Sequence, residues 1–228
     1  MKKAASILMS LLLTVSVSTN AFAALNKVNE PSPVQNTKIS GEVKLNDSNT
    51  IVSKVLTFEE IAQDYAKSEK VSISEAKNIF VQDILKTDAN INSLAEAKAA
   101  VASIAYRTVY NQFTVTSVYK PSVKFYLQTN ETGVEWDWSI RAVLNTSMNR
   151  LYNGIVKEFG GTVYVNLQNN FTIYYDVEGT WYNTGTTTFD TGISVGLGKA
   201  ATWGANVSNA TSYYSYSSFN RIFYPLNY

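Results

Sequence analysis

The stretch VYVNLQNNFTIYYDV, residues 163–177, carries the pattern that decides the fold of this chain. Hydrophobic residues alternate with others on both sides of Asn169-Asn170, at Val163, Val165, Leu167, Phe171, Ile173, Tyr175 and Val177. Alternation with a period of two is typical of a β-strand that buries one face. Asparagine tolerates a positive φ, so Asn169-Asn170 predicts a tight turn between two antiparallel strands.

Alternation of the same kind, interrupted by turn residues, extends from Tyr106 to Tyr228. The expected strands cover residues 106–119, 123–127, 134–140, 163–167, 171–177, 180–189, 193–197, 201–207 and 212–223. Glu178-Gly179 is expected to start a turn, and Asn209 to form a hinge between the last two strands. Short strands at regular spacing predict an antiparallel β-sandwich or a partly closed β-barrel of about eight strands.

A helical segment is predicted before these strands, over Leu56 to Ala105. Thr57 is followed three residues later by Glu60, and Ser93 by Glu96, which are capping-box patterns for helix N-termini. Apolar residues spaced three and four apart predict short helices that fold back on one another. Three short helices bury too little surface to be stable alone. We therefore expect an α+β fold in which the helices cover one face or edge of the sheet.

The first 23 residues have the layout of a secretory signal peptide. A basic head, Met1-Lys2-Lys3, precedes an apolar run from Ala4 to Val17, and Ala21-Phe22-Ala23 places small residues at a cleavage site. The apolar run is shorter than the roughly 20 residues that a membrane-spanning helix needs. Cleavage is expected between Ala23 and Ala24, which predicts a secreted, extracellular protein.

The predicted organisation has four parts. After the signal peptide, residues 24–55 are expected to form a flexible polar leader, because Pro31-Ser32-Pro33 cannot lie inside a regular element and apolar residues are sparse. A short strand is expected within this leader around Ile39 to Leu45. The four parts are the signal peptide 1–23, the leader 24–55, the helical segment 56–105 and the aromatic-rich β domain 106–228.

Composition excludes several kinds of chemistry. The chain contains no histidine and no cysteine, so a histidine general base, a cysteine nucleophile and a Cys/His zinc site cannot exist. We expect no catalytic residues, no cofactor and no metal, and we predict a protein that is not an enzyme. Without the two lysines of the signal peptide, the chain has 17 basic and 18 acidic residues. A nucleic-acid partner is not expected, because such partners select a basic surface.

Tyrosine is the residue type that points most directly to a ligand. The β domain holds 25 of the 29 aromatic residues. The tyrosines that alternate with the apolar positions, or lie among Asn, Thr and Ser, are Tyr126, Tyr164, Tyr174, Tyr182 and Tyr214. An exposed ring packs against the C–H face of a sugar while neighbouring polar groups bind its hydroxyls, so these residues predict a site for a cell-wall or host glycan. The alternative is a structural role, because tyrosine favours strands in its own right.

Two pairs of carboxylates leave a hydrolase open as a third possibility. Glu135 and Asp137 lie two residues apart, as do Asp176 and Glu178. Residues at this spacing share one strand face, about 7 Å apart. That separation resembles the distance between the acid and base of a glycosidase. Alternating charge is equally typical of a solvated strand face.

Trp136 and Trp138 are expected in the core. Both fall on the apolar parity of their predicted strand, together with Val134 and Ile140, while charged residues occupy the opposite parity. A shift of one residue in register would place both tryptophans in solvent. Burial of these rings therefore tests the predicted strand register.

The segment from Thr184 to Ser208 suggests a second class of function. It is rich in Thr, Gly, Ser and Asn, and apolar residues alternate from Ile193 to Leu197. Amphipathic strands of this type are used by pore-forming proteins, in which one face meets lipid and the other meets water. A secreted, membrane-active toxin or bacteriocin that acts on a membrane surface is therefore the alternative to glycan binding, and an ordinary sandwich hairpin would show the same pattern.

Two short motifs carry a resemblance to known proteins. They are Lys120-Pro121-Ser122-Val123-Lys124-Phe125-Tyr126 and Phe159-Gly160-Gly161-Thr162-Val163-Tyr164. With the signal peptide and the short helical segment, the region from Tyr106 onward resembles small secreted proteins of Gram-positive bacteria that have no assigned activity. The resemblance implies a secreted bacterial protein, and it implies no site residue.

Overall fold

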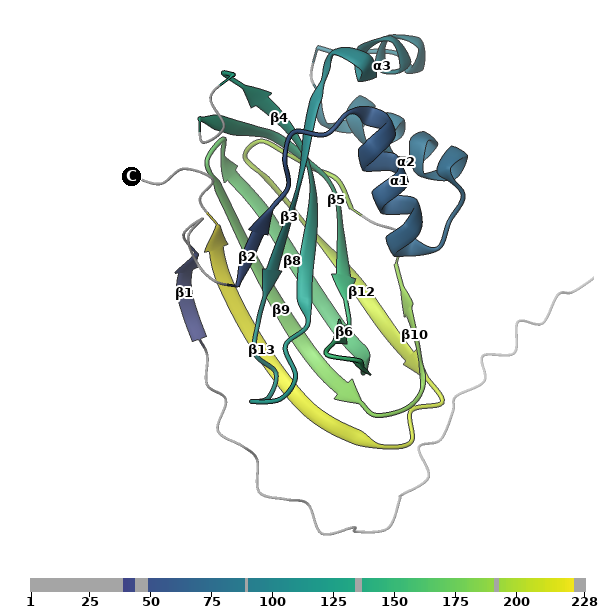
Figure 1. Cartoon of the computed structure of the whole chain (residues 1–228), viewed down its shortest axis with the longest axis vertical. Coiled ribbons are helices and arrows are strands. Elements are labelled where there is room, and N and C mark those ends of the chain that lie inside the picture. Colours follow the sequence, from purple (N-terminus) through teal and green to yellow (C-terminus); the bar gives the residue numbers. More distant parts are fainter. Residues whose placement is uncertain (1–38, 44–48, 89, 134–136, 191–192, 224–228) are drawn as a thin grey trace, which may run out of the picture. The chain divides into compact units, whose positions relative to one another are not determined.

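The computed structural model describes residues 39–43, 49–88, 90–133, 137–190 and 193–223. These residues form three layers, which are a group of helices, a five-stranded sheet and a six-stranded sheet (Figure 1). The five-stranded sheet is the middle layer, because helices pack on one of its faces and the other sheet packs on the opposite face. The predicted signal peptide lies outside the described residues.

The predicted helical segment forms three helices, which confirms the helical part of the α+β prediction. They are α1 (Phe58–Glu69), α2 (Ile73–Thr87) and α3 (Leu94–Ala100), and a short 3-10 turn, η1 (Val101–Ser103), follows α3. Thr57 caps α1 in a full capping box with Glu60. Among the described residues, no helix is both long and apolar enough to cross a bilayer.

The five-stranded sheet has the order β11-β5-β4-β3-β2, and all its neighbours are antiparallel. Its strands are β2 (Thr50–Val52), β3 (Ala105–Gln112), β4 (Ser122–Glu131), β5 (Trp138–Asn149) and β11 (Val195–Gly196). Strand β2 corrects the prediction of a flexible leader up to residue 55. Thr50, Ile51 and Val52 pair with β3, because the edge of β3 offers backbone groups that this segment satisfies.

The six-stranded sheet has the order β1-β13-β9-β8-β12-β10, and only β1 and β13 are parallel. Its strands are β1 (Ile39–Val43), β8 (Glu158–Asn169), β9 (Thr172–Tyr182), β10 (Thr186–Phe189), β12 (Lys199–Ser208) and β13 (Tyr213–Phe223). A separate small hairpin joins β6 (Leu151–Tyr152) to β7 (Ile155–Val156). The sheets do not close into a barrel, so the sandwich-like alternative describes the fold and the strands outnumber the predicted eight.

The core between the two sheets is built by the alternation seen in the sequence. In the β8–β9 hairpin, Val163 pairs with Val177, and both side chains are buried. The turn occupies Asn170 and Phe171, one residue later than predicted. Trp138 is also in this core, at 2% exposure, which confirms its predicted burial. Trp136 lies outside the described residues.

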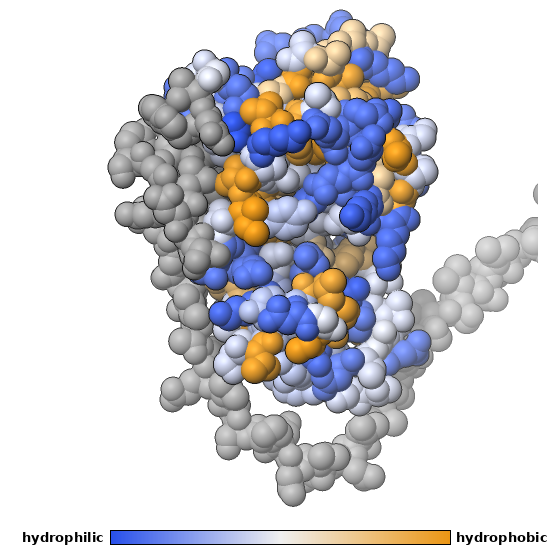
Figure 2. Space-filling view, viewed as in Figure 1, coloured by the Kyte–Doolittle hydropathy of each residue, from blue (hydrophilic) through white to orange (hydrophobic). Residues whose placement is uncertain are grey.

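A second core lies between the helices and the five-stranded sheet. It joins buried residues of α1 and α2, such as Ile61 and Phe80, to Tyr106 and Tyr126 on the strands. Both faces of β4 are therefore buried, one against the other sheet and one against the helices. Figure 2 shows the outer surface of this region, where hydrophilic residues predominate and hydrophobic side chains form small separate groups.

Glu178-Gly179 does not form the predicted turn and lies in the middle of β9. Gly179 stands opposite Gly161 on β8, and the ring of Phe159 fills the space that two side chains would otherwise take. A Cβ atom at position 179 would lie 2.5 Å from the carbonyl oxygen of Gly160 and 2.6 Å from the Phe159 ring. Glycine here provides space for packing between paired strands and does not mark the end of a strand.

Replacement of Gly179 by alanine is expected to lower the free energy of unfolding by about 1–3 kcal/mol, because the added methyl group overpacks the core. Urea denaturation followed by circular dichroism measures the change. Gly196→Ala is the matched control, since a Cβ atom there meets nothing closer than 3.4 Å. Equal stability of the two variants would contradict the packing role of Gly179.

Candidate functional site

The outer face of the six-stranded sheet brings aromatic and polar side chains together. The inward positions of β8 and β9 fill the core, so the alternate positions point to the opposite side of the sheet. The helices pack on the other sheet and do not cover this face. We call it the tyrosine face, and its members are Tyr164, Asn166, Tyr174, Asp176, Glu178 and Tyr216.

Two tyrosines form the centre of the tyrosine face. Tyr164 stands opposite Asp176, and Asn166 stands opposite Tyr174, so the two rings lie diagonally across the β8–β9 pair. Their centroids are 5.9 Å apart, with an angle of 63° between the ring planes. The side-chain amide of Asn166 donates to the hydroxyl oxygen of Tyr164 at 3.3 Å. Both rings are half-buried, so each is held by its neighbours and still reaches solvent.

Carboxylates continue the tyrosine face along β9. The hydroxyl of Tyr216 donates to Oε1 of Glu178, and this hydrogen bond raises the pKa of Tyr216 to about 12. Burial, with the nearby charge of Asp176, raises the pKa of Tyr174 above its usual value. These tyrosines are therefore neutral at physiological pH, and their hydroxyls can donate as well as accept hydrogen bonds.

Three of the five predicted tyrosines lie on this side of the sheet. Tyr164 and Tyr174 are in contact. Tyr182 lies on the same strand and parity as Tyr174, at the far end of β9, where it stands opposite Glu158 and Tyr213. The sheet therefore places Tyr182 several strand positions away from the central pair.

The prediction that Tyr126 is exposed is wrong, because the structure buries this side chain completely. Its ring lies 5.1 Å from the ring of Tyr65 on α1 and 5.7 Å from the ring of Phe80 on α2. The alternation on β4 does place Tyr126 opposite the hydrophobic positions, as predicted. That face is covered by helices, so Tyr126 cannot contact an external glycan.

Tyr214 is also turned toward the protein. Its hydroxyl and that of Thr116 are 2.8 Å apart and hydrogen-bonded, and its ring packs edge-on against Tyr119. Lys157 covers the same ring, with Nζ 4.3 Å from the centroid. A β-bulge between Tyr213 and Ser215 shifts the register of β13, which explains why parity alone did not place this side chain.

The predicted carboxylate pairs have different outcomes. Asp176 and Glu178 share the tyrosine face, as their spacing predicts. Glu135 lies outside the described residues, and Asp137 precedes β5, where its backbone carbonyl accepts hydrogen bonds from Thr132. Within the described ranges, no group of three or more acidic side chains is arranged to hold a metal ion.

The segment from Thr184 to Ser208 does not form one continuous hairpin. Strands β10 and β12 pair at the edge of the six-stranded sheet, whereas β11 between them pairs with β5 in the other sheet. Trp203 and Ala205 on β12 are buried in the core between the sheets. The alternating residues of this segment therefore contribute strands to both sheets and do not form a single hairpin.

Tyr216 lies on the tyrosine face but is not among the five tyrosines predicted from the sequence. It alternates with Ser215 and Ser217 along β13, and this alternation was the available signal. Its place beside Glu178 depends on the register between β13 and β9.

No protein-family model, curated protein sequence or solved structure matches the chain. The chemistry of the tyrosine face must therefore support any functional conclusion.

Proposed function

We propose that this chain is a secreted, non-enzymatic protein that binds a cell-wall or host glycan on the tyrosine face. The observation that carries the proposal is the contact between Tyr164 and Tyr174 on a sheet face that the helices do not cover. Had the helices packed on this sheet, both rings would have been buried, as Tyr126 is.

The chemistry of the tyrosine face suits a sugar. Half-buried rings offer apolar faces to the C–H groups of a pyranose, and restricted rings lose little entropy on binding. The amide of Asn166 and the carboxylates of Asp176 and Glu178 surround the rings with donors and acceptors for hydroxyl groups. The carboxylates would repel the phosphates of a nucleic acid, which supports a neutral or cationic glycan.

Replacement of Tyr174 by alanine is expected to weaken glycan binding roughly tenfold or more, since one ring contact worth about 1.4 kcal/mol corresponds to that factor. The stability loss should be small, about 1 kcal/mol, because the ring is only half-buried. The measurement is retention on insoluble peptidoglycan, with a glycan array to identify the sugar. Tyr164→Ala is expected to behave in the same way.

Phe171→Ala is the matched control, because Phe171 is an exposed aromatic in the turn of the same hairpin and not on the tyrosine face. It should retain full binding. Absence of binding to every glycan by folded protein would overturn the proposal. Dye release from liposomes at micromolar protein would favour the membrane-active alternative, and glycan cleavage that is lost in Asp176→Ala would favour the hydrolase.

A further inference from the structure

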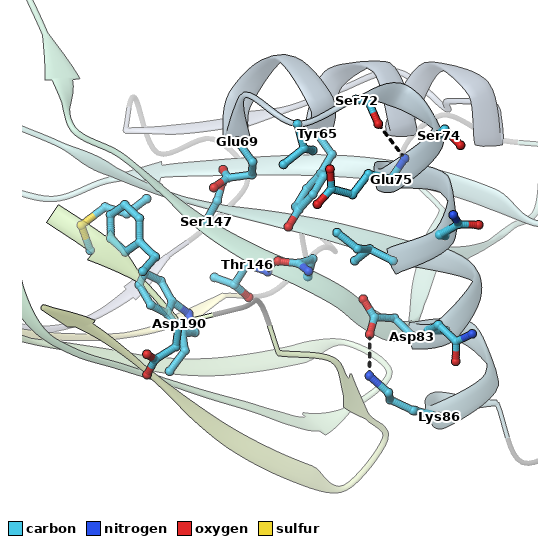
Figure 3. A pocket seen from close by; sticks show the side chains of 18 residues that line it. Tyr65, Glu69, Ser72, Ser74, Glu75, Asp83, Lys86, Thr146, Ser147 and Asp190 are labelled. Carbon is cyan, nitrogen blue, oxygen red and sulfur yellow. Dashed lines mark hydrogen bonds and ion pairs between the residues drawn. The ribbon is translucent and has the colours of Figure 1, made fainter.

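A cavity of about 770 Å³ lies between the helices and the free edge of β5 (Figure 3). Helices α1 and α2 form one wall, and residues 145–148 of β5 form another. Phe189 of β10, Asp190 after it and Trp203 of β12 complete the lining. The cavity shares no side chain with the tyrosine face, so the two sites are independent.

The cavity exists because β11 is short. This strand pairs with β5 only at Ala142 and Val143, and among the described residues no strand continues along that edge. Beyond this point β5 carries three consecutive polar residues, Asn145, Thr146 and Ser147, and all three are buried. A run of buried polar residues in the middle of a strand is unusual unless something pairs with them.

Five polar side-chain atoms that border the cavity are buried and have no partner at ordinary hydrogen-bond geometry within the described part of the chain, although Asn145 lies close enough to Asp83, and Ser147 to Glu69, to lower the pKa of those carboxyl groups. The five atoms are Oδ2 of Asp83, Nδ2 of Asn145, Oγ1 of Thr146, Oγ of Ser147 and Nε1 of Trp203. Each of these residues is at least nine-tenths buried. Buried polar groups are normally well paired, so this concentration of poorly paired atoms around one cavity favours a polar occupant over an apolar one.

The cavity is acidic. Among the described residues, its lining includes four carboxylates, Glu69, Glu75, Asp83 and Asp190, but only one ammonium group, that of Lys86. Lys86 contacts Oδ1 of Asp83 at 3.3 Å and is otherwise largely in solvent, at 64% exposure. Burial raises the pKa of Asp83 to about 6, although Lys86 and the nearby Ser194 and Asn145 lower it. Burial also raises the pKa of Glu69.

One wall of the cavity is aromatic. Trp203 and Phe189 pack edge-on with their centroids 5.4 Å apart. Asp190 beside them is held in place because its Oδ2 accepts a hydrogen bond from the backbone of Gly204 at 3.0 Å. An apolar ring face next to carboxylates suits a ligand with both C–H groups and a positive charge.

We propose that this cavity binds a small hydroxylated amine, of which an amino sugar is the simplest example. The ammonium group would contact Oδ2 of Asp83, in the field of the other carboxylates. The hydroxyl groups would pair with the amide of Asn145, the hydroxyls of Thr146 and Ser147 and the indole N–H of Trp203. The aromatic wall would pack against the C–H groups of the ligand.

Other occupants fit less well. The excess of carboxylates opposes an anion such as a phosphate or a carboxylic acid. A purely apolar ligand would leave the five polar atoms unpaired, which is unfavourable. Water alone would satisfy the polar atoms but would gain nothing from the Phe189 and Trp203 rings.

The test is calorimetric titration of the full mature chain with D-glucosamine, and with D-glucose as its neutral counterpart. Glucosamine is expected to bind at least about tenfold more tightly than glucose, because only the amine can form a charged hydrogen bond with Asp83. Asp83→Asn should remove this preference. Equal affinity for the two sugars, or no binding of glucosamine at tens of millimolar, would overturn the proposal.

Two further variants complete the test. Glu59→Gln removes an exposed carboxylate on α1 that pairs with Lys77 and does not line the cavity, so it should bind glucosamine like the wild type. Trp203→Phe keeps an aromatic ring but removes the unpaired N–H, and it should weaken binding of glucosamine severalfold. If Asp83→Asn does not fold, binding of glucosamine by Trp203→Phe tests the proposed site in its place. Unchanged binding by Trp203→Phe, or loss of binding by Glu59→Gln, would contradict the assigned site.

Discussion

Replacement of Trp181 by alanine is expected to lower the free energy of unfolding by about 3–5 kcal/mol, a large part of the ~5–15 kcal/mol typical of a native protein. The side chain is completely buried, and its ring lies 4.8 Å from the Phe159 ring and 5.4 Å from the Tyr119 ring. Its indole N–H donates to Oγ of Ser217 at 2.8 Å. The substitution thus removes a ring that connects the two sheets and leaves a buried hydroxyl unpaired.

Urea denaturation and thermal melting, both followed by circular dichroism, measure this effect, and the melting temperature should fall by roughly 10 °C. Trp181→Phe is the control, because it retains most of the packing and loses only the hydrogen bond to Ser217. It should cost about 1–2 kcal/mol. If Trp181→Ala unfolds at the wild-type urea concentration, the packing between the sheets differs from the one described.

Replacement of Asp64 by alanine is expected to cost about 3 kcal/mol at pH 7, because it leaves the charge of Lys124 buried without its partner. Lys124 lies on β4 beneath the helices, its side chain is 2% exposed, and its ammonium donates to Oδ2 of Asp64 on α1. The rings of Tyr110 and Tyr126 flank Nζ, each centroid 4.6 Å away. Contact with these rings reduces the loss of stability but does not replace the carboxylate. Urea denaturation measures the loss of stability.

Two comparisons separate the ion pair from simple packing. The double variant Asp64→Leu/Lys124→Met should recover most of the lost stability, since it removes both charges. Burial lowers the pKa of Lys124 below its usual value of 10.5, and loss of Asp64 should lower it further. The folded state of Asp64→Ala then binds fewer protons than the unfolded state below pH 10.5, so its stability should rise as the pH rises toward 10.5. A deficit that is independent of pH would contradict this explanation.

The candidate site was predictable only in part. Alternation along β8 and β9 correctly placed Tyr164 and Tyr174 on the face opposite the core, because that relation depends on neighbouring residues in one strand. The same rule correctly placed Tyr126 on the strand face opposite the hydrophobic positions, but it did not predict that this face is buried. Helices that precede Tyr126 by about 50 residues in the sequence cover it. The polar run at Asn145 was visible in the sequence, but the cavity beside it was not.

What the sequence determined by itself is local. Side-chain caps at Thr57 and Ser93 set where helices begin, and period-two alternation set which side chains share a strand face, because both depend on groups a few residues apart. Only the tertiary structure decided that β11 joins the five-stranded sheet while β10 and β12 join the six-stranded sheet. It also decided that Gly179 lies within a strand. The helices cover one face of β4 and leave the outer face of β9 uncovered, which is a third such decision. These choices depend on contacts between residues far apart in sequence, whose packing free energy has no counterpart in local periodicity.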